Sequence, residues 1–206
     1  SAESAGSHEY TVARVDCLAR GASLGRGYFI RAQHVAGDAP ASADQPGRLS
    51  MPFTPPISLV NPLSLRAFNA AYYHRQRARS TRHTGHYRPF FYPLDGIRHW
   101  NRMYGPRGFL QHQCVLPPQA ARDGIAALLR EISRSGQGSF LAVLKEFGPR
   151  PSLGPLSFAR AGTTLALDFP NIPGVFPLLD RLDAIVREAG GAVYPAKDAR
   201  MSAATF

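Results

Sequence analysis

Polar side chains recur at alternate positions in three predicted strands, and their types suit them to binding a polar ligand. They are Gln111 and Gln113 in strand 109–116, Lys145 in strand 140–147 and Thr164 in strand 163–169. Because successive side chains of a strand point to opposite faces of a sheet, each strand has one apolar face and one face with these polar groups. A lysine within an apolar strand is costly unless it faces solvent or a binding site.

Two interpretations of this polar face stay open. A solvent-exposed face of an antiparallel sheet produces the same alternation, and lysine is usually exposed. A water-facing surface usually carries more charge, however, than two glutamines, one lysine and one threonine among apolar residues. We therefore favour a ligand-facing wall, with the exposed face as the alternative.

The elements around these strands predict the fold class. An amphipathic helix is expected over 118–135, because Ile125, Leu128, Leu129 and Ile132 follow helical spacing. A second helix is expected over 175–189 and a last short strand over 192–194. The resulting β-α-β-β-α-β order over 107–195 predicts an α+β fold. It has a mixed, mainly antiparallel sheet with helices on one face, and it contains a ferredoxin-like unit.

The first half of the chain is expected to extend or flank this sheet. Alternation predicts two strands, over 8–16 and 27–34, and helical spacing predicts a helix over 63–76. The segment 35–62 is rich in Pro, Ala, Ser and Asp and is expected to be irregular.

The composition indicates a folded chain with an uneven positive charge. The 206 residues are 44% hydrophobic and 18% charged, with a net charge of +10. No run of about 18 apolar residues exists, so no membrane-spanning helix is expected. The segment Arg75–Arg88 holds five arginines and no acid. Such a segment is either a solvated loop or a surface that attracts phosphates or anionic lipid.

The charge also raises the alternative of a basic nucleic-acid-binding module. A ferredoxin-like sheet with this charge can bind RNA, but such sheets stack bases on aromatic residues of the open face. Here only Phe147 clearly lies on that face, and the arginines lie in a loop. No nucleic-acid partner is therefore expected. Cys17 and Cys114 are far apart, and no metal-ligand or disulfide spacing is visible.

Several ordered stretches resemble one known family. They are 91–95 (FYPLD), 100–106 (WNRMYGP), 108–113 (GFLQHQ), 141–149 (LAVLKEFGP), 156–158 (LSF), 167–170 (LDFP) and 194–200 (YPAKDAR), with a looser match over 8–34. They resemble the substrate-binding half of FAD-linked oxidoreductases similar to decaprenylphosphoryl-β-D-ribose oxidase. These belong to the wider vanillyl-alcohol-oxidase and aldonolactone-oxidase type.

The resemblance implies a domain plan and an activity. Residues 1–196 would form the substrate-binding (cap) domain, and 197–206 would begin the return to an FAD domain outside this sequence. The chain would then be an inactive fragment of an enzyme that oxidises a sugar or polyol hydroxyl by hydride transfer to FAD. A polyprenyl-phosphate pentose, a cell-wall arabinan precursor, would be its substrate. The resemblance also implies a reductase partner and a cytoplasmic location. It further implies that the enzyme can lie peripherally at the inner membrane face, in contact through Arg75–Arg88.

The resemblance also implies roles for individual residues. Lys197 matches the catalytic lysine that lies at the flavin and at the substrate hydroxyl. The implied substrate-binding residues are Gln111, Gln113, Val143, Lys145, Phe147, Thr164, Ala166 and Tyr92. Phe91 is the alternative to Tyr92, because the register of that stretch is open. The mycobacterial member has Asn-x-Cys where this chain has Thr164-x-Ala166, and this difference leaves the identity of the substrate open.

Overall fold

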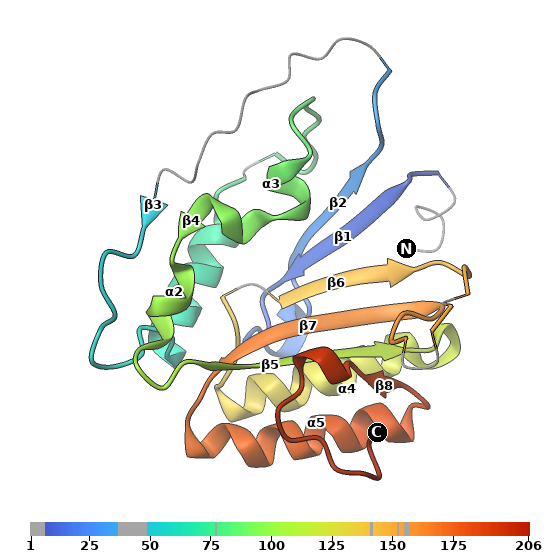
Figure 1. The fold of residues 1–206 in the computed structure, drawn as a ribbon. Helices are drawn as coiled ribbons and strands as arrows, with labels where there is room; N and C mark the ends of the chain where they lie inside the picture. Colours follow the sequence, from blue (N-terminus) through green and yellow to red (C-terminus); the bar gives the residue numbers. More distant parts are fainter. Residues whose placement is uncertain (1–6, 37–48, 77, 141, 152, 155–156) are drawn as a thin grey trace.

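The computed structural model describes residues 7–36, 49–76, 78–140, 142–151, 153–154 and 157–206 (Figure 1). The segment 37–48, part of the region 35–62 that was predicted to be irregular, lies outside these residues. So do Arg77 of the basic segment and Leu141 and Leu156 of the family-like stretches. In the described residues, no helix is both long enough and apolar enough to cross a bilayer.

The centre of the molecule is a six-stranded sheet with the order β2-β1-β6-β7-β5-β8. All its strand pairs are antiparallel. Its strands are β1 (Tyr10–Val15), β2 (Gly27–Ala32), β5 (Phe109–Leu116), β6 (Ala142–Phe147), β7 (Gly162–Pro170) and β8 (Ala192–Val193). The predicted strand pair at the start of the chain thus extends the sheet, through the pairing of β1 with β6.

Two amphipathic helices, α4 (Pro118–Ser135) and α5 (Phe176–Glu188), cover one face of this sheet (Figure 1). Their apolar stripes bury Leu128 and Leu182 in the same core cluster as Leu165 of β7, with no measurable exposure of any of the three. The predicted α+β fold with a mainly antiparallel sheet is confirmed. The order β6-β7-β5-β8 is the one that a β-α-β-β-α-β unit requires, and the assignment to ferredoxin-like folds stays a prediction.

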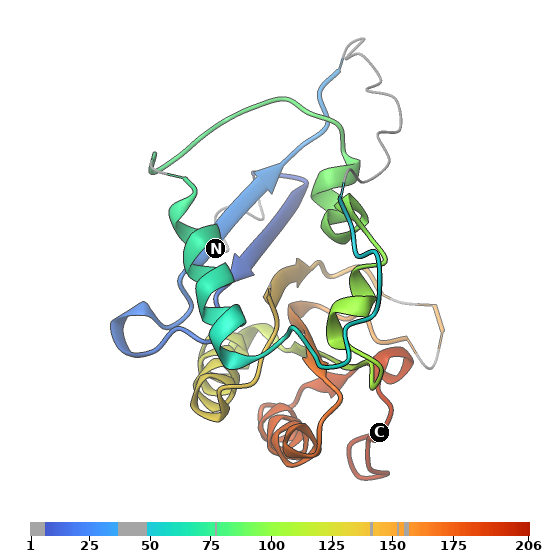
Figure 2. The ribbon, with the colours of Figure 1, turned by 90° about the vertical axis from the view of Figure 1, so that its left-hand side faces the viewer.

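The helix α2 (Pro62–His74) packs beside β1 and β2 (Figure 2). It begins with a capping box: the Asn61 side chain accepts from the backbone N–H of Ser64, and the Ser64 hydroxyl accepts from the backbone N–H of Asn61. These bonds satisfy donors that the first turn of a helix leaves unpaired.

A group of short elements lies across from α2 (Figure 2). They are α3 (Arg88–Phe91), the short parallel pair β3 (Leu49–Ser50) and β4 (Ile97–Arg98), and the 3₁₀ turns η2 (Pro93–Gly96) and η3 (Trp100–Tyr104). Tyr104 of η3 is buried, and its ring lies 4.8 Å from the ring of Phe109 in β5. Phe109 shares its sheet face with Gln111 and Gln113, so η3 covers one end of the face that α4 and α5 leave open.

Candidate functional site

The polar residues predicted from alternation lie together on the sheet face that α4 and α5 leave open. Lys145 of β6 lies directly opposite Thr164 of β7. Gln113 of β5 lies opposite Ala166, and its side chain reaches Thr164. The prediction that Gln113, Lys145 and Thr164 project from one face is confirmed. Val143, on the same face of β6, lies opposite Ala166 on its other side.

Hydrogen bonds across β5 and β7 fix the two glutamine amides. Gln113 donates through Nε2 to Thr164 Oγ1 over 3.1 Å, and Gln111 donates through Nε2 to Asp168 Oδ1 over 2.8 Å. An amide that donates through nitrogen keeps its carbonyl oxygen as an acceptor. The face therefore offers both donors and acceptors at fixed positions, as recognition of hydroxyl groups requires.

Lys197 reaches this face from the short turn η5 (Pro195–Lys197), which follows β8. The turn is tied to the sheet by the backbone N–H of Tyr194, which donates to the carbonyl of Gln113 over 2.8 Å. Lys197 is half-buried, and its charge acts on both Lys145 and Asp168. These two residues and Lys197 therefore share one electrostatic environment.

Desolvation and like charges perturb the ionisable groups of this face. The pKa of Lys145 is lowered by partial desolvation, and further by the neighbouring charges of Lys197 and Arg14. The pKa of Asp168 is raised, because desolvation outweighs the hydrogen bond from Gln111 and the charge of Lys197. Shifted pKa values of this kind are common at binding and catalytic sites, although structural networks produce them as well.

The two lysines stand out in the composition. The sequence contains 24 Lys and Arg residues in total, and Lys145 and Lys197 are its only lysines. Lysine is a compact charge whose pKa shifts readily, whereas arginine stays charged in almost any environment. Lys145 lies on the open sheet face, and Lys197 is near enough for its charge to act on Lys145. The described residues give neither lysine an ion pair with a carboxylate.

The aromatic residues clarify one predicted assignment. Tyr92 is 56% exposed, and its ring contact is with Phe91. Phe91 instead lines a groove of about 480 Å³ together with Lys145 and Phe147. Of these two candidate aromatic residues, Phe91 lies in the groove with Lys145, and Tyr92 is exposed to solvent. Residues 88–91 form a helical turn, and this turn decides which ring faces inward.

Comparisons with known proteins support the residue-level resemblance. Over 214 aligned positions, 97% of this chain is 34% identical to decaprenylphosphoryl-beta-D-ribose oxidase of Mycolicibacterium smegmatis (strain ATCC 700084 / mc(2)155). The predicted resemblance to this oxidase is confirmed. A Streptomyces coelicolor protein described as an uncharacterized protein in mprA 5'region is 32% identical over 94% of the chain. The chain spans 44% and 56% of these two relatives, about half the length of each. No family model matches.

One residue of the open sheet face was absent from the predicted site. Asp168 follows the same alternation as Thr164 and Ala166, so its face was predictable, but its contact with Gln111 was not. It adds a partly buried carboxylate to a face otherwise made of amides, a hydroxyl and cations.

A buried network on the other face anchors the segment that carries Lys197. His112 donates through Nε2 to Asp183 Oδ1 over 3.1 Å, since an ionised carboxylate can only accept. Arg200 donates to Asp183 Oδ2 over 3.0 Å and to Asp180 Oδ1 over 2.9 Å. Burial alone would raise the pKa of Asp183, but the bond from His112 and the charge of Arg200 outweigh it and lower that pKa. No local sequence pattern indicated this network.

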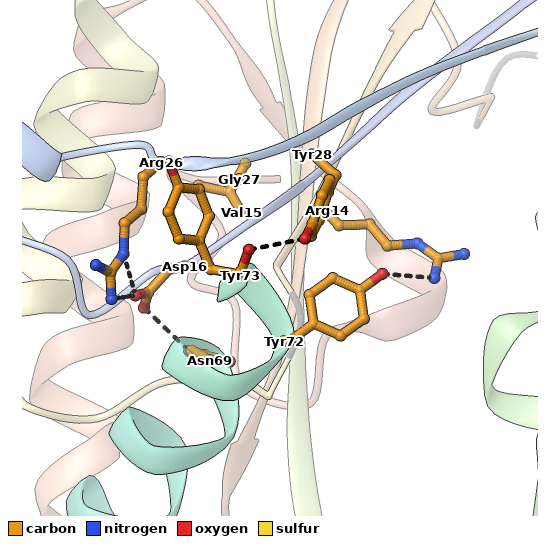
Figure 3. Close-up of a pocket in the computed structure, with 9 residues that line it drawn as sticks. All are labelled: Arg14, Val15, Asp16, Arg26, Gly27, Tyr28, Asn69, Tyr72 and Tyr73. Carbon is orange, nitrogen blue, oxygen red and sulfur yellow. Dashed lines mark hydrogen bonds and ion pairs between the residues drawn. The ribbon is translucent and has the colours of Figure 1, made fainter. Parts of the chain in front are cut away.

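A second polar cluster, at the end of β1, has a structural role (Figure 3). Asp16 accepts from the side chain of Asn69 in α2 over 3.1 Å and pairs with Arg26 over 2.8 Å. Arg14 donates to the Tyr72 hydroxyl over 3.2 Å. The cavity between them, about 10 Å³, has room for about one water molecule, so the cluster joins α2 to the sheet. Among the described residues, no three His, Cys, Asp or Glu side chains are grouped as metal ligands.

Proposed function

We propose that this chain is the substrate-binding part of an FAD-dependent oxidoreductase that oxidises a CH–OH group of a sugar or polyol. The observation that carries the proposal is the arrangement of Gln111, Gln113 and Lys145 on one open sheet face, with the charge of Lys197 close by. It is supported by the match to an oxidase named for a decaprenylphosphoryl-ribose. The preferred substrate is a polyprenyl-phosphate pentose.

The residues of the face suit a bound flavin at Lys197. This cation is half-buried, and it has no carboxylate ion pair among the described residues, so a nearby anion would lower the free energy of the site. When bound, FAD would accept the hydride from the substrate carbon. Lys197 would lie at the flavin and the substrate hydroxyl, where its positive charge stabilises negative charge that develops during transfer.

The other residues of the face would position the sugar. The amide groups of Gln111 and Gln113 can accept from or donate to hydroxyls, and their bonds to Asp168 and Thr164 hold them in place. Lys145 would attract the phosphate. Preorganised groups of this kind reduce the entropy cost of bringing a substrate carbon to its acceptor.

The test uses the protein encoded by the complete reading frame that contains this chain. We expect it to be yellow as purified, and we expect a polyprenyl-phosphate pentose to bleach the flavin absorbance under anaerobic conditions. The 206-residue chain alone is expected to be colourless and inactive. A full-length protein that binds no flavin, or whose flavin is not reduced by any sugar or polyol, would refute the proposal.

The proposal extends to location and partners. A cytoplasmic enzyme with the segment Arg75–Arg88 at an anionic lipid surface would have direct access to a lipid-linked substrate. A reductase partner would complete the reaction sequence. Co-sedimentation with anionic vesicles, compared between wild type and a variant with Arg79 and Arg82 changed to Gln, tests the membrane contact. Equal sedimentation of the two proteins would argue against it.

A further inference from the structure

The groove beside Lys145 has a shape and a composition that the binding of a sugar does not explain. Its volume is about 480 Å³, which falls within the range of about 300–1,000 Å³ typical of small-ligand pockets. Its walls come from β1, β6 and α3, and they include Tyr10, Val12, Phe90, Phe91 and Phe147. A sugar needs hydrogen-bonding groups along its length, whereas these walls are mainly aromatic and aliphatic.

The aromatic walls follow from strand register and ring contacts. Val12 lies opposite Lys145 in an antiparallel pair, so alternation places Tyr10, two residues before Val12, and Phe147, two residues after Lys145, on the same face. The Tyr10 ring lies 5.0 Å from the ring of Phe91 and 6.3 Å from that of Phe90. All these rings are only partly buried, so they retain apolar surface that a ligand can cover.

A row of rings connects the groove to the proposed sugar site. The Phe147 ring lies 6.1 Å from that of Phe158, and Phe158 stacks on Tyr194 at 4.5 Å. Tyr194 precedes the turn that carries Lys197. A molecule with a polar head at Lys197 and an apolar chain toward Phe91 would therefore pass Lys145 on its way.

The charges around Lys145 favour the binding of an anion there. Lys145 is close enough to the cations Lys197 and Arg14 for both to lower its pKa. Glu9, Glu146 and His8 also line the groove, but among the described residues none of them forms an ion pair with Lys145. Three like charges repel one another, and an anionic group bound at Lys145 would relieve this repulsion.

We propose that this groove binds the apolar chain of a prenyl phosphate, with the phosphate at Lys145 and the chain between Tyr10, Phe90, Phe91 and Phe147. The inference rests on the proposed function, because the sugar would be the third part of the same molecule. It adds a subsite for the lipid part of the substrate, formed by residues of β1 and α3.

The test measures binding of farnesyl phosphate to the protein encoded by the complete reading frame that contains this chain. Isothermal titration calorimetry is used, below the concentration at which the lipid forms micelles. Ribose 5-phosphate, which lacks the apolar chain, is the comparison ligand. Phe91→Ala is expected to weaken farnesyl phosphate about tenfold or more, the loss expected for an uncovered aromatic ring, and to leave ribose 5-phosphate unchanged. Lys145→Gln is expected to weaken both ligands.

Two further variants make the result decisive. Phe176→Ala removes a comparably exposed ring at the start of α5, far from the groove, and is expected to change neither ligand. Phe90→Ala repeats the test if Phe91→Ala fails to fold, as judged by circular dichroism. Farnesyl phosphate that binds no more tightly than ribose 5-phosphate, or binds equally to Phe91→Ala and Phe176→Ala, would overturn the inference. If ribose 5-phosphate still binds in a Lys145-dependent way, the proposed function survives that outcome. If neither ligand binds, both proposals fail.

Discussion

The replacement Asp183→Asn tests whether the buried network truly anchors the segment that carries Lys197. Asp183 is 2% exposed and receives bonds from His112 and Arg200, whose side chain is 11% exposed. Removing one partner of a buried ion pair leaves the other charge uncompensated, at a cost of about 3–5 kcal/mol. Because Arg200 keeps Asp180 and His112 can donate to the new amide, we expect a value near the lower limit, about 3 kcal/mol.

The assay is thermal and urea unfolding followed by circular dichroism. For a domain of this size, about 3 kcal/mol corresponds to a fall in Tm of roughly 6–12 °C. Asp180→Asn is the matched control, because it removes a carboxylate from the same arginine at a position that is 70% exposed, where an ion pair contributes about 0–1 kcal/mol. Equal losses in the two variants would refute the anchoring role.

The pH dependence supplies a second check on the same residue. The folded pKa of Asp183 lies below its ordinary value of 3.8, so its contribution to stability is fully present above about pH 4. That contribution is lost as the pH falls through the folded pKa. The difference in unfolding free energy between wild type and Asp183→Asn should therefore shrink below about pH 4. A difference that stays constant down to pH 2 would contradict this account.

Three further predictions follow from the described contacts. Reductive ¹³C-methylation allows the two lysines to be titrated by NMR. The titration midpoint of Lys145 should be lower in the native protein than in urea, because desolvation and neighbouring cations lower its pKa. A native midpoint at or above the urea value contradicts this. Cys17 and Cys114 are buried, and desolvation raises their pKa values to about 12. Iodoacetamide at pH 8 should therefore modify them only in urea. Rapid modification of the native chain would argue against their burial. Gly27→Ala should destabilise the fold by about 1–3 kcal/mol, because a Cβ at this position collides with the backbone of Arg14. An unchanged urea midpoint would contradict this close approach of β1 and β2.

Alternation along strands was sufficient to predict the sheet face that holds the site. Successive side chains of a strand point to one of two faces. Because the two helices pack on the apolar face of 163–169, Thr164 must point to the opposite face. The amphipathic pattern of 118–135 likewise identified the covering helix, since apolar side chains at that spacing must pack on something. These predictions depend on short-range spacing, which the sequence displays directly.

Contacts between distant segments could not be predicted in the same way. His112 lies 71 residues from Asp183, and nothing in the local pattern of either residue indicates the other. The choice between Phe91 and Tyr92 stayed open in the sequence for a different reason. The stretch forms a turn of helix, in which neighbouring side chains diverge by about 100°, so the two-way alternation of a strand did not apply. Arg14 was likewise missed, because its influence on Lys145 depends on the pairing of β1 with β6.

The central claim is that Lys197 acts on the substrate and the flavin from the open sheet face. The most direct test is the rate of substrate-dependent flavin reduction in the full-length protein, compared between Lys197→Gln and Arg130→Gln, which removes an exposed charge on α4. We predict that Lys197→Gln retains bound flavin but loses at least about 10²-fold in the rate of reduction, the cost typical of removing one group that stabilises developing charge. The rate for Arg130→Gln should be unchanged. Normal flavin reduction by Lys197→Gln would contradict the account.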